Sequence, residues 1–201
     1  MAEPGAIDDD LDRAPTDHDL GRLQWTTVLY YLHETNPDNG LVRDKTDPAA
    51  PCSIAAVGLA LATIPVIVER QVVIRKFAAK IARRRLRSLL DLPQGPGPDA
   101  AGHKGFFYHF LDIDTGRRVW DCELSTLDSA FLFAGVLTCA TYFDADTADE
   151  AEVRRLADAL YRRADWDWAR NGVPTLTHGW RPETAAVWKA LREIRAGTAT
   201  R

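Results

Sequence analysis

Two uncharged apolar stretches alternate along this chain with two stretches that have one charged face. The first, residues 54–68, reads IAAVGLALATIPVIV, and the second covers residues 130–140. Each is followed by an amphipathic stretch with helical spacing, over residues 71–90 and 150–163. Helical hairpins with one inner and one outer helix give such a pattern. The sequence therefore predicts an all-α fold, either an α/α toroid of paired helices or a simple helical bundle.

Turn signals divide the remaining sequence. A first helix is expected over residues 20–35, because apolar residues recur there at helical spacing before an Asn-Pro-Asp-Asn-Gly turn. Ser53 is predicted to be the N-cap of the first apolar helix. The aromatic run GFFYHFLD, residues 105–112, and the return segment 117–120 predict one short β-hairpin. The hairpin leads into a helix expected over residues 125–143.

We expect three segments in the chain. Residues 1–19 are acidic and lack aromatic side chains, which predicts a disordered arm. Residues 20–183 form the predicted domain, and residues 184–201 form a weak tail helix. Trp166 and Trp168 are expected in a loop near the end of the domain. The chain has 201 residues, of which 46% are hydrophobic and 27% charged, and this usage excludes collagen-like or low-complexity proteins.

Composition and motifs exclude several classes of function. The net charge of −4 argues against nonspecific nucleic-acid binding. The apolar stretch of residues 54–68 is shorter than the roughly 20 residues of a membrane span. The first 20 residues lack the basic flank and apolar run of a secretory signal, so a cytoplasmic protein is expected. The spacing of the cysteines and histidines fits no metal site, and no cofactor motif is present, so no cofactor is expected.

The densest group of functional residue types lies between Gly105 and Asp128. Five aromatic residues, His109 and three acids, Asp121, Glu123 and Asp128, fall within this stretch. Aromatic faces stack on sugar rings, and carboxylates bind hydroxyl groups or transfer protons. Hydrolysis of a glycosidic bond needs two carboxyl groups that flank the bond. This stretch therefore indicates a carbohydrate site.

A structural interpretation of the same acids remains open. Ser125 and Asp128 have the spacing of a capping box, and acids are favourable at a helix N-terminus in any protein. Asp121 would then close the hairpin. Glu123 precedes the expected cap, so capping explains it less well than it explains Asp128.

Seven short motifs, in order along the chain, resemble the glucoamylase-like domain family of bacterial carbohydrate proteins. That family includes endo-β-1,2-glucanases and a domain of cyclic β-1,2-glucan synthases. The motifs are Leu23-Gln24-Trp25, NPDNGLVRD (36–44), CSIAAVG (52–58), GFFYHFL (105–111), VWDCELSTLD (119–128), residues 132–137 and HGWRP (178–182). From the first to the last, they extend over roughly residues 20–183, which is most of the chain.

The resemblance implies a glycoside-hydrolase-like domain of (α/α)6 architecture that acts on β-linked glucan. It implies Glu123 as the nucleophile or water-activating base, with Asp121 and Asp128 as supporting acids. It also implies that oligo- or polysaccharide is bound by a further set of side chains. These are Arg43, Asp44, Phe107, Tyr108, His109, Trp120 and Trp180.

The resemblance extends only over the N-terminal half of such a domain. Family members carry another catalytic carboxylate on a later inner helix, and neither Glu183 nor Glu193 stands in that context. Whether the chain is an enzyme is therefore left open. The alternative is a truncated, inactive remnant that binds carbohydrate, and a homo-oligomer is a further way to complete the barrel.

Overall fold

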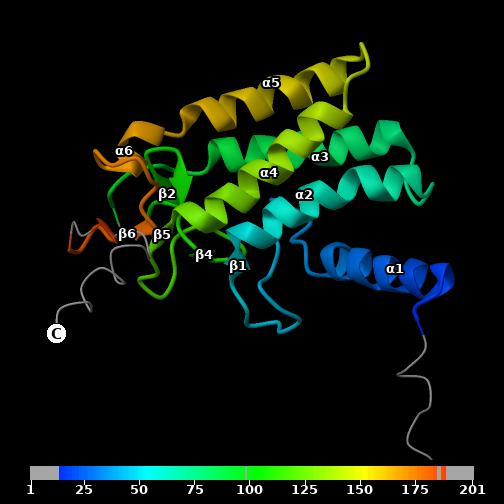
Figure 1. Cartoon of the computed structure of the whole chain (residues 1–201), viewed down its shortest axis with the longest axis horizontal. Coiled ribbons are helices and arrows are strands. Elements are labelled where there is room, and N and C mark those ends of the chain that lie inside the picture. Colours follow the sequence, from blue (N-terminus) through cyan, green and yellow to red (C-terminus); the bar gives the residue numbers. More distant parts are fainter. Residues whose placement is uncertain (1–13, 98, 185–186, 189–201) are drawn as a thin grey trace, which may run out of the picture.

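The computed structural model describes residues 14–97, 99–184 and 187–188, and these residues contain six helices and seven very short strands (Figure 1). The helices are α1 (Asp17–His33), α2 (Ile54–Glu69), α3 (Arg75–Asp91), α4 (Thr126–Tyr142), α5 (Ala148–Arg163) and α6 (Trp166–Arg170). The strands are β1 (Cys52–Ser53), β2 (Gly102–His103), β3 (Phe106–Phe107), β4 (Phe110–Leu111), β5 (Leu124–Ser125), β6 (Gly179–Trp180) and β7 (Val187–Trp188).

The predicted alternation of inner and outer helices is confirmed. The two apolar helices, α2 and α4, pack against each other, and the amphipathic helices α3 and α5 pack together as a second layer (Figure 1). The α3 residues that face the core include Ala78, Ala82 and Leu86, whereas Arg83, Arg84 and Arg87 are exposed. Burial of one stripe of each outer helix explains their spacing in the sequence.

Two glycines let α2 and α4 approach until their backbones touch. A Cβ atom at Gly135 would lie 1.9 Å from the carbonyl oxygen of Gly58, and one at Gly58 would lie 2.3 Å from the oxygen of Phe131. Real carbon and oxygen atoms cannot come so close, so only glycine fits at either position. The crossing is therefore fixed by the absence of these two side chains.

The expectation that α2 and α4 are buried on all sides is wrong. Leu59 and Val66 on α2 are exposed, as are Phe131 and Leu137 on α4. Each inner helix has neighbours on one face, and the opposite face, which has no charged residue between residues 54 and 68 or between 129 and 142, meets solvent within the described structure. The two uncharged runs are thus half buried.

The N-terminal segment enters its helix earlier than expected. Helix α1 begins at Asp17, so residues 17–19 belong to it and not to an arm, whereas residues 1–13 lie outside the described residues. Thr16 is the N-cap, and its side chain and that of Asp19 exchange hydrogen bonds with the two backbone amides. This capping box fixes the start of the helix.

The predicted β-hairpin is present but is only one part of the β-structure. Leu111 and Arg118 form a single bridge across the turn that contains Gly116. The aromatic run also pairs with three other segments: β4 with β1, β3 with β2, and Tyr108 with Leu124. Pairing between residues far apart in sequence has no local signal, which is why one hairpin was expected.

Two smaller expectations need correction. Trp166 and Trp168 lie in the short helix α6 rather than in a loop. Val187 and Trp188, in the expected tail helix, form a strand that pairs with β6, and residues 189–201 lie outside the described structure. The prediction that Ser53 is the N-cap of α2 is confirmed, although its side chain makes no capping hydrogen bond.

None of the helices in the described residues is both long and apolar enough to cross a lipid bilayer. A cytoplasmic location stays a prediction.

Candidate functional site

Main-chain hydrogen bonds align three segments at the N-terminal ends of α2 and α4. The amide of Ile54 donates to the carbonyl of His109 at 3.1 Å, and the amide of His109 donates to the carbonyl of Glu123 at 3.0 Å. Leu124 then pairs with Trp180 of β6. Because these bonds involve only backbone atoms, they hold His109 and Glu123 in register whatever the surrounding side chains are.

The side chains of Glu123 and Asp128 lie at opposite nitrogens of the same imidazole. His109 Nδ1 is 3.1 Å from Glu123 Oε1, and His109 Nε2 is 3.8 Å from Asp128 Oδ1. The Phe110 ring stacks on the imidazole with centroids 3.8 Å apart, which fixes the plane of the ring. The structure therefore brings together three of the residues that the sequence singles out.

Asp128 also has the capping role that the sequence left open. Its backbone amide donates to Ser125 Oγ at 3.1 Å, and the Ser125 hydroxyl donates to the Asp128 carboxylate. One carboxylate oxygen thus contacts the cap residue while the other faces His109. Capping and a place beside His109 are compatible in this geometry.

Arg181 belongs to the same cluster and was missed as a site residue. Its Nη2 is 3.9 Å from Glu123 Oε2, and its Nη1 donates to the carbonyl of Asp121 at 3.0 Å. The strand pair β5–β6 carries Arg181 to this place, directly after Trp180. The His-Gly-Trp-Arg-Pro motif was the available signal. Arg181 thus places a positive charge beside the Glu123 carboxylate.

Trp120 and Asp121 both adopt left-handed backbone conformations, with φ of 58° and 48°. Such conformations are unfavourable for bulky residues and are frequent at functional sites. The Trp120 side chain is 68% exposed, and its ring meets that of Phe110 edge-on at 5.3 Å. An exposed indole next to the His109 cluster offers the kind of flat face on which sugar rings stack.

Phe107 and Tyr108 do not have the predicted contact with substrate. Both side chains are fully buried. The guanidinium of Arg118 lies over the Tyr108 ring at 4.5 Å, and burial raises the pKa of Tyr108. Residues 105–108 are all buried, so the core takes both rings, whereas His109 is only partly buried.

The remaining predicted residues lie apart from the His109 cluster. Trp180 is half-buried, and its ring stacks on His103 with centroids 4.8 Å apart. Arg43 forms an ion pair with Glu34 at 3.7 Å, and Asp44 is exposed on the loop that follows. Neither Arg43 nor Asp44 has a recorded contact with Glu123, so their predicted role in binding stays a prediction.

Glu183 has a structural partner. Both of its carboxylate oxygens accept hydrogen bonds from the buried Arg118, which also donates to the carbonyl of Cys122 at 2.6 Å. This fork-to-fork contact gives the buried guanidinium of Arg118 a charged partner, which offsets its loss of hydration. Within the described residues, no group of three or more His, Cys, Asp or Glu side chains is arranged to hold a metal ion.

Sequence comparison and structure comparison both find similarity to β-1,2-glucan hydrolases. The chain is 27% identical over 177 residues to an exo β-1,2-glucooligosaccharide sophorohydrolase (non-reducing end) of Parabacteroides distasonis. It superposes on a β-1,2-glucanase of the same species with a TM-score of 0.73 and 25% identity, over 86% of this chain. A glucoamylase-like protein of Bacteroides uniformis also has a TM-score of 0.73, at 25% identity over 87% of this chain.

The resemblance to the glucoamylase-like domain family is confirmed. The prediction of a partial α/α toroid of helical hairpins is confirmed with it. No protein-family model matches the sequence.

The chain spans only part of these relatives. It covers 23% of the sophorohydrolase, 25% of the Parabacteroides distasonis β-1,2-glucanase and 42% of the Bacteroides uniformis protein. The glucoamylase-like fold described here is therefore a portion of the corresponding domain.

Proposed function

We propose that this chain contributes one half of a glycoside-hydrolase-like site that acts on β-linked glucan. Glu123 is the reactive carboxylate, His109 and Arg181 position it, and Trp120 is a stacking surface for a glucose unit. Asp128 and Asp121 are supporting acids. The similarity to proteins named for β-1,2-glucan hydrolysis supports the substrate class.

The single observation that carries this proposal is the contact between Glu123 and His109. The carboxylate receives a hydrogen bond from Nδ1 when that nitrogen is protonated, and Arg181 lies at its other oxygen. These two contacts hold the carboxylate in one orientation and leave its remaining lone pairs directed outward. An ionised, oriented carboxylate is what attack on an anomeric carbon, or on the water that attacks it, requires.

Glycoside hydrolysis also needs a carboxylic acid that protonates the leaving oxygen. Asp128 lies at the other nitrogen of His109, but its second oxygen is held by Ser125. An acid from outside the described residues fits the role better. A second copy of the chain is one source of it, and the uncharged exposed face of α2 and α4 is the surface on which that copy would pack.

The alternative proposal is a remnant that binds carbohydrate without turnover. The chain spans only part of each relative's length, and this favours the remnant. Loss of one member of a catalytic pair removes most of the rate. In that case Trp120 stacks on a sugar ring and the acids bind hydroxyl groups, without cleavage of a glycosidic bond.

Reducing-sugar release from linear β-1,2-glucan separates the two proposals. We expect slow release by the wild-type chain and at least a hundredfold loss in Glu123→Gln, which keeps the size of the side chain. Asp167→Asn is the matched control, because its carboxylate is almost fully exposed and contacts only Arg170. Glucan binding without release would favour the remnant, and absence of both release and binding would contradict both proposals.

A further inference from the structure

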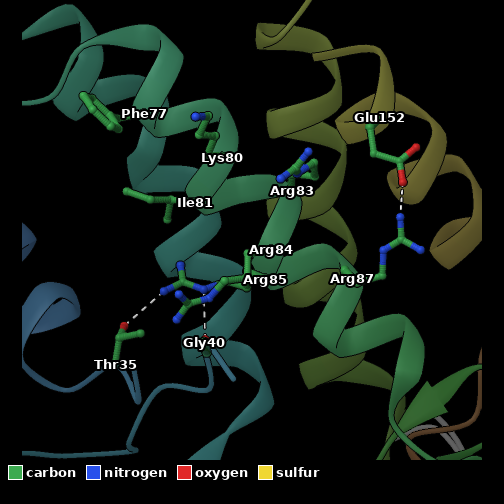
Figure 2. A pocket seen from close by; sticks show the side chains of 10 residues that line it. All are labelled: Thr35, Gly40, Phe77, Lys80, Ile81, Arg83, Arg84, Arg85, Arg87 and Glu152. Carbon is green, nitrogen blue, oxygen red and sulfur yellow. Dashed lines mark hydrogen bonds and ion pairs between the residues drawn. The ribbon is translucent and has the colours of Figure 1, made fainter. Parts of the chain in front are cut away.

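A cationic cavity lies between α3 and the loop that follows α1, and it shares no residue with the Glu123 cluster. Its volume is about 690 Å³. The lining residues from α3 are Phe77, Lys80, Ile81, Arg83, Arg84, Arg85 and Arg87, and the others are Thr35, Gly40 and Glu152 (Figure 2).

Arg85 is a buried cation with no carboxylate partner in the part of the chain that the structure describes. Its side chain is only 6% exposed, and it donates from Nε to the carbonyl of Gly40 at 2.9 Å and from Nη2 to the Thr35 hydroxyl at 3.0 Å. Both partners are neutral (Figure 2). A buried guanidinium is normally paired with a carboxylate, because neutral acceptors do not offset the loss of hydration. Burial accordingly lowers the pKa of Arg85 to about 10.

The surroundings of Arg85 add positive charge instead of neutralising it. Arg84 is close enough to lower the pKa of Arg85 further, and no ion pair of Arg84 or Lys80 is recorded among the described residues. Arg83 and Arg87 at the far side of the cavity are already neutralised, by Asp149 at 2.8 Å and by Glu152. Three cations without a carboxylate partner among the described residues, Lys80, Arg84 and Arg85, therefore line this cavity.

We propose that this cavity binds the phosphate group of a small organic phosphate. The group would lie against Arg84, Arg85 and Lys80, because guanidinium groups bind phosphate oxygens in pairs and a lysine adds a point charge. The Thr35 hydroxyl lies beside it as a further polar group. The exposed apolar side chains of Phe77 and Ile81 line the same cavity and would contact the organic part.

Calorimetric titration at constant ionic strength tests the proposal, with inorganic phosphate, glucose 6-phosphate and glucose as probes. We expect saturable binding of both phosphates, tighter for glucose 6-phosphate, and none of glucose. At 100 times Kd the bound phosphate raises Tm by about 5 to 10 °C. Arg84→Gln is exposed and should fold, and we expect it to weaken binding at least tenfold.

Lys76→Gln is the matched control, because Lys76 is exposed on the same helix but does not line this cavity. We expect it to bind phosphate as the wild type does, whereas Phe77→Ala should reduce the preference for glucose 6-phosphate over inorganic phosphate. Equal weakening in Lys76→Gln and Arg84→Gln would overturn the proposal, since it would indicate general charge attraction. Absence of saturable binding, or binding only to phosphatidylglycerol vesicles in a sedimentation arm, would overturn it as well.

Discussion

Arg75 in the first turn of α3 and Glu150 in the first turn of α5 form a two-pronged ion pair. Arg75 Nε lies 2.9 Å from Glu150 Oε1, and Nη2 lies 2.8 Å from Oε2. The guanidinium also donates to the carbonyl of Tyr142 at 2.7 Å, and the carboxylate accepts the amide of Ala145 at 2.9 Å. This pair therefore connects both outer helices with the end of α4.

The ion pair makes stability depend on pH. The hydrogen bonds from Arg75 hold the pKa of Glu150 below its ordinary value, so the folded state binds its proton less readily than the unfolded state. The stabilisation is present above pH 4.5, the ordinary glutamate value, and is lost as the pH falls through the lowered folded pKa. We expect Glu150→Gln to lower the free energy of unfolding by about 2 kcal/mol at pH 7.

Urea denaturation at several pH values measures this effect. The difference between wild type and Glu150→Gln should shrink as the pH is lowered from 7 to 3. Asp158→Asn, which removes an exposed ion pair with Arg162 on the same helix, should change stability by less than about 0.5 kcal/mol. A difference between wild type and Glu150→Gln that is the same at pH 7 and pH 3 would contradict the assigned role.

A methyl group at the crossing of α2 and α4 should be costly. In Gly135→Ala the new Cβ would meet the Gly58 carbonyl at 1.9 Å, and the helices would have to separate. We expect a loss of about 3 kcal/mol. Gly21→Ala in α1 is the control, because no atom lies within 4 Å of its added Cβ, and it should gain about 0.8 kcal/mol from helix propensity. Thermal unfolding of both variants checks the prediction.

Trp120→Ala should affect ligand binding much more than folding. The indole is mostly exposed and makes one ring contact, with Phe110, so its removal should change stability by less than about 1 kcal/mol. We expect binding of β-1,2-glucan oligosaccharides to weaken about tenfold, as measured by quenching of tryptophan fluorescence or by calorimetry. Trp25→Ala, a half-exposed tryptophan on α1, should leave that affinity unchanged. Equal affinity of wild type and Trp120→Ala would remove Trp120 from the site.

The cysteines should be unreactive in the folded protein. Cys52, Cys122 and Cys139 are free and buried, and burial raises the pKa of both Cys52 and Cys139 to about 12. Because the thiolate is the reactive form, an aromatic disulfide reagent at pH 8 should label them slowly in buffer and rapidly in denaturant. Fast labelling of a native thiol would show that the core around it opens.

The helices could be predicted from the sequence because their signals are local. The uncharged run before Glu69 and the arginine-rich face of α3 locate one hairpin, and the stripe of Val153 and Leu156 locates the outer helix of the other. The close approach of Gly58 and Gly135 could not be predicted, because it depends on how two distant segments meet.

The candidate site was predictable only in part for the same reason. Glu123 and His109 stand in one short stretch of sequence, and their aromatic and acidic neighbours indicate carbohydrate chemistry. Tyr108 and Phe107 stand in that stretch as well, but the direction of each side chain depends on pairing with β2 and with Leu124. Arg181 is 58 residues from Glu123 and reaches it only through the pairing of β5 with β6.

The register that joins His109 to Glu123 depends on peptide groups alone. Point substitutions in the neighbourhood leave such a scaffold intact, so the spacing of the two functional groups is protected against gradual sequence change. Even a variant without turnover would therefore keep these two groups at the same spacing.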